Sequence, residues 1–192
     1  AFFNAPKLLL APTIARDKNG QVSFDLSEEG LQAFYSLDGS DPKSGGIAYK
    51  ESFELLQPAT LKAVSKDPIT GEFSEPITIA FPLAKKKWKV MNPEKDASKL
   101  IDDDPSTNYT SKQNKASIDL GENQEISGFT YYPIQNRYMS GLIKDVEFYT
   151  SLVGKNWQKA GFGEFGNISN SPIEQQVEFE PRTARYIRLI AK

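Results

Sequence analysis

The chain of 192 residues carries a formal net charge of -2 and contains neither histidine nor cysteine. This composition excludes Ser-His-Asp and Cys-His catalysis, cysteine/histidine zinc sites and disulfides within the chain. With no basic excess and no apolar run near the roughly 20 residues that cross a bilayer, we expect neither a nucleic-acid partner nor a membrane span.

Alternating apolar residues predict short β-strands along the chain. From the N-terminus, Val22, Phe24 and Leu26 alternate with polar residues, which is the two-residue period of a strand. No stretch carries a helical apolar stripe over three turns, so the sequence indicates an all-β protein. The strand period recurs at Ala33, Tyr35 and Leu37, at Ile77, Ile79 and Phe81, at Val146 and Phe148, and at Gln175, Val177 and Phe179.

Turn signals separate these strands. Glycine, proline, asparagine and aspartate favour the tight turns that join short strands. Many short strands joined by such turns are typical of β-sandwiches. The signals are Asn19-Gly20, Asp38-Gly39, Asp41-Pro42, Gly45-Gly46, Gly121-Glu122 and Asn170-Ser171-Pro172.

The segment PLAKKKWKV, residues 82–90, interrupts this rhythm between two stretches of similar character. Its lysines form either a basic patch or, in an otherwise acidic chain, a solvated linker, and we favour the linker. Trp88 is then a core residue that opens the second domain. The sequence therefore predicts two domains, residues 1–83 and 84–192.

The first domain carries the string YSLDGSDP, Tyr35 to Pro42, which the strand TLKAVS follows. By residue type, Asp38 and Asp41 form turns. This order resembles the small β-sandwich module at the C-terminus of chitobiases and β-hexosaminidases. The resemblance implies a small, immunoglobulin-like β-sandwich without catalytic function.

The second domain opens on LIDDDPSTNY, residues 100–109. On an extended chain Asp102 and Asp104 point to one side, and converging carboxylates repel unless a cation, a donor or water separates them. Calcium, which takes six to eight oxygen ligands, would suit Asp102, Asp104 and Thr107. The spacing alone favours a solvated turn over a metal site, and adjacency in one loop argues against a glycosidase acid pair.

The second domain resembles the discoidin-like coagulation factor five/eight type C domain over residues 88–192. Its motifs, in order, are LIDDDPSTNYTS, ASIDLGENQEISGFTYYP, GLIKDVEFYTSLVGKNW and PRTARYIRLIAK. The resemblance implies a jelly roll, and many bacterial members are family 32 carbohydrate-binding modules. In this family the acidic loop wraps a structural calcium ion. That implies Asp102 and Thr107 as side-chain ligands, and Asp104 through its carboxylate or its carbonyl.

The chain departs from the family pattern in the acidic loop and at its end. Asp103 stands where the family usually has glycine, and Tyr109 where it has tryptophan. Relatives commonly continue past the position of Lys192 into a segment whose glutamate completes the ion site. Without that segment we expect weaker calcium binding. Where calcium binds, we expect its chelation to lower the melting temperature by several degrees.

The resemblance also implies a sugar site in altered form. Galactose-binding relatives use a Pro-Arg-Gln stretch and an Asn-Gly-Arg stretch, but here Ile134, Ser140 and Leu142 replace three of those polar groups. Sugar sites combine an aromatic face with planar polar groups, which this loop offers in another arrangement. Arg137 and Tyr138 are either ligand contacts or exposed loop residues. The predicted carbohydrate-binding residues are Gln135, Asn136, Arg137, Tyr138 and Asn167.

Three further residues are interpreted as structural. Trp157, in GKNWQK after a strand, is typical of a residue that packs on a hairpin. Arg185 and Arg188 flank Tyr186 in the last strand, where solvated or paired side chains are favoured over phosphate binders.

Together the resemblances imply a non-catalytic, carbohydrate-binding accessory region of an exported bacterial glycoside hydrolase, in the periplasm or at the cell surface. It would hold an upstream catalytic domain near glycans that contain galactose, N-acetylhexosamine or fucose. The alternative is a structural spacer that supports the catalytic domain without binding sugar. Catalysis by the chain itself is the least favoured hypothesis. The start at Ala1 is expected of a fragment, with any export signal upstream of it.

Overall fold

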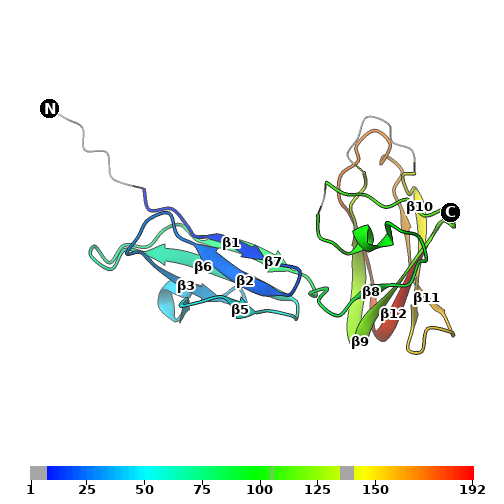
Figure 1. Cartoon of the computed structure of the whole chain (residues 1–192). Helices are drawn as coiled ribbons and strands as arrows, with labels where there is room; N and C mark the ends of the chain where they lie inside the picture. Colours follow the sequence, from blue (N-terminus) through cyan, green and yellow to red (C-terminus); the bar gives the residue numbers. More distant parts are fainter. Residues whose placement is uncertain (1–7, 105, 135–140) are drawn as a thin grey trace. The chain divides into compact units, whose positions relative to one another are not determined.

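The computed structural model describes residues 8–104, 106–134 and 141–192. Contacts divide the chain into two compact units, Ala1–Lys86 and Lys87–Lys192, which run from blue to green and from green to red in Figure 1. Each unit is described by itself. The longer elements of the described residues are all β-strands, and no helix among them is long and apolar enough to cross a bilayer. The prediction of an all-β protein is confirmed.

The first unit consists of two antiparallel sheets around one core. One sheet has the strand order β1-β2-β5, and the other has the order β4-β3-β6-β7. A 3-10 turn, η1 (Pro42–Ser44), follows β3. The strands are β1 (Thr13–Arg16), β2 (Gln21–Asp25), β3 (Gln32–Ser36), β4 (Ile47–Ala48), β5 (Phe53–Glu54), β6 (Ala59–Lys66) and β7 (Ile77–Phe81).

Apolar side chains of both sheets meet in the core of the first unit. Val22 of β2 and Leu61 of β6 are fully buried. The ring of Phe24 stacks on that of Tyr49, with the centroids 4.3 Å apart. Burial of such side chains contributes about 1.5–3 kcal/mol each. The alternation of apolar residues seen in the sequence therefore places the rings between the sheets.

Aspartates close the turns of the first unit. Asp38 Oδ1 accepts a hydrogen bond from the N–H of Ser40 at 3.0 Å. Asp41 Oδ1 accepts one from the N–H of Lys43 at 3.1 Å and caps η1. The hydroxyl of Ser36 donates to the carbonyl oxygen of Ser40 at 2.7 Å and ties this loop to β3. The interpretation of Asp38 and Asp41 as turn formers is confirmed.

The second unit has a five-stranded antiparallel sheet in the order β11-β10-β12-β9-β8. The two longest strands, β9 and β12, pair with each other and lie side by side in Figure 1. Their register shifts between Glu178 and Arg182 and again between Ala184 and Tyr186, which lets both strands bend around the core of this unit. The elements are β8 (Lys89–Val90), η2 (Ala97–Leu100), β9 (Lys115–Tyr131), β10 (Asp145–Ser151), β11 (Gln158–Glu164) and β12 (Gln175–Ala191).

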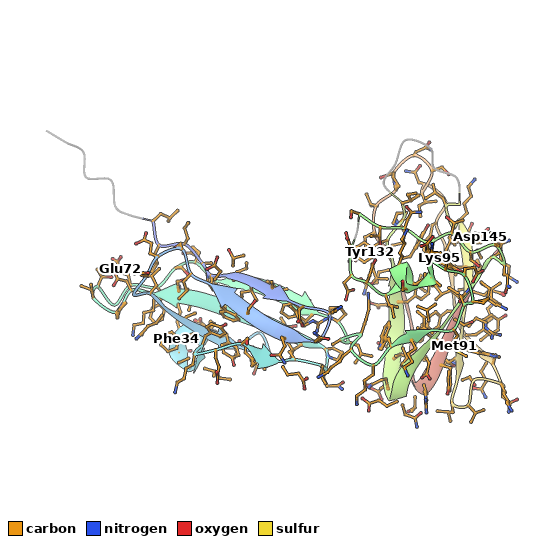
Figure 2. All side chains as sticks on the ribbon, in the orientation of Figure 1. Phe34, Glu72, Met91, Lys95, Tyr132 and Asp145 are labelled. Atoms are coloured by element: carbon orange, nitrogen blue, oxygen red, sulfur yellow. The ribbon has the colours of Figure 1, made fainter. Side chains whose placement is uncertain are left out.

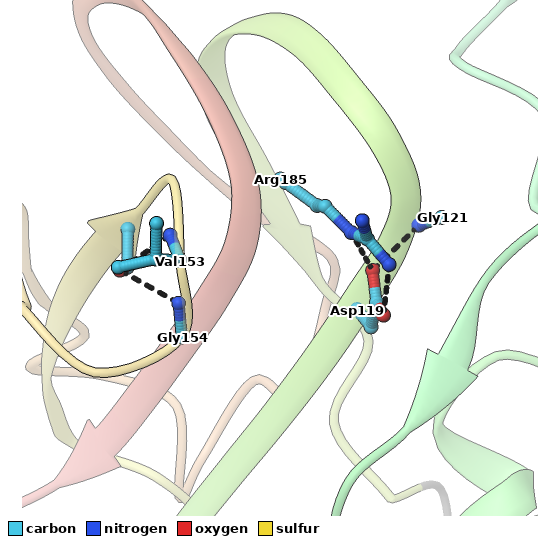
Figure 3. Close-up of polar contacts among 6 residues, drawn as sticks. Asp119, Gly121, Val153, Gly154 and Arg185 are labelled. Atoms are coloured by element: carbon cyan, nitrogen blue, oxygen red, sulfur yellow. Dashed lines mark hydrogen bonds and ion pairs between the residues drawn. The ribbon is translucent and has the colours of Figure 1, made fainter.

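An ion pair fastens β9 to β12 at the second register shift. Arg185 donates through Nε and Nη2 to the two carboxylate oxygens of Asp119, at 3.0 and 3.1 Å (Figure 3). Asp119 Oδ1 also accepts from the N–H of Gly121 at 2.8 Å. Gly121 has a φ of 85°, a left-handed conformation that suits glycine. The predicted turn at Gly121-Glu122 is wrong as a connection between two strands, because both residues lie inside β9.

The core of the second unit lies on one face of its sheet. Phe148 is 1% exposed, and its ring stacks on Phe129 with the centroids 5.0 Å apart. Trp88 packs against the same cluster, so its interpretation as a core residue is confirmed. Ile187 and Leu189 of β12 also pack there. Because side chains alternate along a strand, Arg188 between them points to the opposite face.

Candidate functional site

The three acids at residues 102–104 lie in an exposed loop after η2. Ile101, which precedes them, packs against the core and holds this end of the loop. Asp103 has a φ of 59°, a left-handed conformation that is uncommon for residues other than glycine. The N–H of Thr107 then closes a turn on the carbonyl oxygen of Asp104 at 3.1 Å.

Three oxygen atoms converge inside this loop. Thr107 Oγ1 lies 2.7 Å from Asp102 Oδ2 and 3.2 Å from the carbonyl oxygen of Asp104. The hydroxyl has one proton, so it donates to only one of these two acceptors at a time. A hard cation would satisfy all three oxygens together. The loop therefore brings the predicted ligands Asp102, Asp104 and Thr107 together, and calcium at this place stays a prediction.

The carboxylate of Asp104 is turned toward Ser106. Ser106 donates to Asp104 Oδ1 from its hydroxyl at 2.6 Å and from its backbone N–H at 2.9 Å. These two bonds, the hydroxyl's first, hold the pKa of Asp104 below its usual value. Of the two alternatives for Asp104, the geometry favours the carbonyl oxygen, because that is the atom which faces Thr107.

The loop supplies part of a calcium coordination shell. The converging carboxylate, hydroxyl and carbonyl oxygens are the donor types that calcium prefers, but the ion takes six to eight such ligands. Over residues 8–104, 106–134 and 141–192, no group of three or more acidic, histidine or cysteine side chains is placed to hold a metal.

Asn92 anchors the other end of the loop. Its Nδ2 donates to the Tyr109 hydroxyl at 3.1 Å and to the carbonyl oxygen of Lys115 at 2.7 Å. Its Oδ1 accepts from the N–H of Ser117 at 2.8 Å. Tyr109 uses its hydroxyl here, a group that tryptophan lacks. Sequence reasoning missed Asn92, because a single asparagine outside any periodic pattern carries no signal of its own.

The predicted sugar-binding residues fall into two groups. Asn167 is exposed in the loop between β11 and β12, and its Oδ1 accepts a hydrogen bond from Asn170 Nδ2 at 3.1 Å. This bond fixes the orientation of the Asn167 amide. The other four, Gln135, Asn136, Arg137 and Tyr138, lie outside the described residues.

The structure adds an exposed aromatic ring that sequence reasoning missed. Tyr132, labelled in Figure 2, is 65% exposed. Tyr131 and Gln175 end the paired part of β9 and β12, so Tyr132 and Glu174 oppose each other just beyond it. Partial burial raises the pKa of Tyr132, as do a hydrogen bond to Glu174 and the nearby charge of Asp103. The signal was the pair of tyrosines at a strand end, where one ring faces inward and the next outward.

This combination of parts is suited to binding a polar ligand. A ring face accepts the C–H patches of a sugar, and carboxylate and amide groups bond to its hydroxyls. Tyr132, Glu174 and Asn167 supply such groups on loops that rigid strands position. By fold, the chain belongs to the class of all-β proteins built from antiparallel sheets.

The family follows from comparison with known proteins. Residues 84–192 match the model of the F5/8 type C domain, and the chain belongs to this family. Residues 15–80 match the chitobiase/beta-hexosaminidase C-terminal domain. Both are accessory modules and neither is a catalytic domain.

One curated protein and two solved structures illustrate what this chain is similar to. A stretch of 104 residues, 50% of this chain, is 38% identical to a sialidase from Micromonospora viridifaciens and covers 16% of that protein. A solved module from Clostridium perfringens, CpGH89CBM32-5 in complex with GalNAc-beta-1,3-galactose, is 23% identical with a TM-score of 0.49, over 56% of this chain and 85% of that one. The C-terminal domain of a chitobiase from Bacteroides fragilis is 25% identical with a TM-score of 0.48, over 57% and 83%.

Proposed function

We propose that this chain is the non-catalytic, carbohydrate-binding part of a larger glycoside hydrolase. The observation that carries the proposal is the F5/8 type C match over residues 84–192, directly after a module of the chitobiase C-terminal kind. The relative from Micromonospora viridifaciens supports it, because a segment like this one forms a small part of a sialidase.

The ligand would be a neutral glycan that contains galactose, N-acetylhexosamine or fucose. Glu174 and Asp103 place negative charge beside Tyr132, and like charges would repel an acidic sugar there. The ring of Tyr132 would contact the apolar face of the sugar, and polar groups would bond to its hydroxyls. Those groups are Gln135, Asn136, Arg137, Tyr138 and Asn167.

A calcium ion would hold the acidic loop in shape. Its ligands would be Asp102 Oδ2, Thr107 Oγ1 and the carbonyl oxygen of Asp104. The two aspartate oxygens already lie within hydrogen-bonding distance of the Thr107 hydroxyl. The ion would neutralise the carboxylate that faces these other oxygens. It would have a structural role, and no step of a reaction depends on it.

In the parent protein the module would act by proximity. A catalytic domain upstream in the same chain would stay near its substrate while the module is bound, which raises the effective concentration of the enzyme at the glycan. Such an enzyme would be exported and would work in the periplasm or at the cell surface, where glycans of this kind are met.

The test is an amide chemical-shift titration of the whole chain with galactose, N-acetylgalactosamine, N-acetylglucosamine and fucose, in calcium buffer and up to millimolar sugar. Saturable shifts at residues 134–140, at Tyr132 and at Asn167 are expected with at least one sugar. Replacement Tyr132→Ala should weaken binding by about tenfold, since stacking on an aromatic ring contributes about 1–1.5 kcal/mol. Leu152→Ala is the matched control, because Leu152 is 55% exposed beyond the far end of β10.

The other outcome would favour a different function. If none of the four sugars produces saturable shifts, the chain is a structural spacer that supports its catalytic domain without binding glycan. Loss of binding in Leu152→Ala as well as in Tyr132→Ala would place the sugar elsewhere.

A further inference from the structure

The sheet of the second unit has a charged face on the side away from its core. Strand alternation and the pairing register place these side chains there, opposite the buried Ile118, Phe148 and Ile187. We call this surface the outer sheet face. It carries the cations Lys89, Lys115, Lys159, Arg185, Arg188 and Lys192, and the acids Asp119, Asp145, Glu147 and Glu164. It is therefore net positive, in a chain whose net charge is -2.

The two acids at the centre of this face already have cationic partners. Glu147 accepts from Lys159 Nζ and from Lys192 Nζ, both at 2.8 Å, and from the Tyr149 hydroxyl at 2.9 Å. Lys159 contributes most to holding the pKa of Glu147 down at about 2. Asp119 is held by both ends of the Arg185 guanidinium. Neither carboxylate is left to pair with another cation.

Arg188, unlike Arg185, has no carboxylate partner among the residues described on this face. Its guanidinium lies over the ring of Trp157, 3.8 Å from the centroid, and its Nε donates to Ser117 Oγ at 3.0 Å. Among the described residues no carboxylate forms an ion pair with it, although burial lowers its pKa and so penalises its charge. The ring and the serine fix the plane of the guanidinium. Its Nη groups are left as a fork of the kind that binds a carboxylate with two parallel hydrogen bonds.

Aromatic rings lie beside this fork on the same face. Tyr149 of β10 is the direct cross-strand neighbour of Arg188. Phe162 of β11 is 50% exposed and lies opposite Glu147, one strand further out. Strand spacing and rise put Phe162 roughly 12 Å from Arg188, about the length of two linked sugars. An exposed ring next to a fixed cation suits a ligand that has both an apolar face and an anionic group.

We propose that the outer sheet face binds an acidic saccharide, with Arg188 holding the carboxylate of a uronic acid unit and Phe162 contacting a neighbouring sugar ring. This site is separate from the loops around Tyr132 and Asn167, where negative charge favours neutral sugars. The proposal does not depend on sugar binding by those loops. One module would then select a neutral and an acidic part of a mixed glycan.

The experiment is a chemical-shift titration of the whole chain with digalacturonate, with its methyl ester, and with sodium acetate. Digalacturonate should give saturable shifts at Ser117, Tyr149 and Phe162 and at the Nε–H of Arg188, and the ester should bind at least tenfold more weakly. Shifts at Tyr132 or Asn167 with galactose report the other site, so failure at one site is distinguishable from failure at the other.

Variants at Arg188 distinguish the geometry of its guanidinium from the effect of its positive charge alone. Arg188→Gln should weaken digalacturonate binding by tenfold or more. Arg188→Lys keeps the charge and the contact with Trp157 but loses the fork, and should weaken it several-fold even if the glutamine variant does not fold. Lys66→Gln is the control, since Lys66 is a cation over the rings of Phe34 and Phe73 in the first unit and is not part of the outer sheet face. Equal binding of the ester, equal affinity for acetate, undiminished binding in Arg188→Lys, or no saturable shift would each overturn the proposal.

Discussion

Two loops of the molecule share the motif Asp-x-Ser and use it in the same way, yet only one of them forms a candidate ion site. In the first unit, Asp38 accepts a hydrogen bond from the N–H of Ser40. In the second unit, Asp104 accepts one from the N–H of Ser106. In both loops the serine lowers the pKa of the aspartate, with its side chain as the larger cause.

The difference arises from what stands beside the motif. In the first unit the next acid, Asp41, bonds forward to Lys43 and caps η1. In the second unit Asp102 precedes the motif and Thr107 follows it, and the Asp102 carboxylate and the Asp104 carbonyl both lie close to Thr107 Oγ1. Asp102 also accepts from the N–H of Asp104 at 3.1 Å, so local donors occur in both loops, and what marks the second loop is the convergence of its oxygens on Thr107.

The largest effect should come from the anchor of the second loop. Asn92→Ala removes three hydrogen bonds, including the side-chain acceptor of the Ser117 N–H and one of the donors to the Lys115 carbonyl, which Ser111 Oγ still contacts. We expect a loss of about 2–3 kcal/mol in the free energy of unfolding, from roughly 1 kcal/mol per bond. Urea unfolding monitored by fluorescence measures it.

Ser36→Ala is the counterpart in the first unit. It removes the hydrogen bond from the Ser36 hydroxyl to the Ser40 carbonyl, and should cost about 1 kcal/mol. Equal losses of unfolding free energy in the two variants would contradict the idea that Asn92 anchors its loop more strongly than Ser36 anchors the first loop.

The next effect is on thermal stability in calcium. If the oxygens of the second loop bind the ion, millimolar calcium should raise the melting temperature by roughly 3–6 °C, and chelation should reverse the rise. Thr107→Val should abolish the response by removing one converging oxygen. Asp41→Asn, in the first loop, should leave it unchanged. A chain that melts at the same temperature with calcium and with chelator has no calcium site.

The sequence predicted the features that depend on a repeating pattern or on residues close together along the chain. Alternation located the strands that carry Val22 and Phe148, because the strand period is local information. The convergence of Asp102 and Thr107 is also local, since they lie within one short loop.

Contacts between distant segments were missed, because local sequence patterns do not show which segments meet in the fold. Asn92 meets Tyr109 and Lys115 only after β8 has paired with β9. Gly121 was interpreted as a turn between two strands, because the conformational freedom of a glycine does not show whether a strand ends there or continues through it. Tyr132 became visible as a surface ring once the end of the β9–β12 ladder was known.

A smaller effect is the dependence of stability on pH through Asp38 and Asp104. Since hydrogen bonds lower the folded-state pKa of both Asp38 and Asp104, each contributes stability that is complete above the unfolded pKa of about 3.9. That contribution is lost as the pH falls through the lowered folded value. The difference in melting temperature between the parent and either Asp→Asn variant should therefore shrink from pH 6 to pH 3, by similar amounts for the two sites in calcium-free buffer. A difference that stays constant with pH would contradict this.

The smallest effect separates the two loops atom by atom. Carbon-13 spectra of the carboxyl and carbonyl groups can follow each aspartate as calcium is added. The carboxyl carbon of Asp102 and the backbone carbonyl carbon of Asp104 should shift and saturate together, because those oxygens face Thr107. The carboxyl carbons of Asp104 and Asp38 should stay nearly still, since serine donors hold both. If the Asp104 carboxyl moves as far as that of Asp102, the ion has displaced Ser106, and the loop rearranges to bind it.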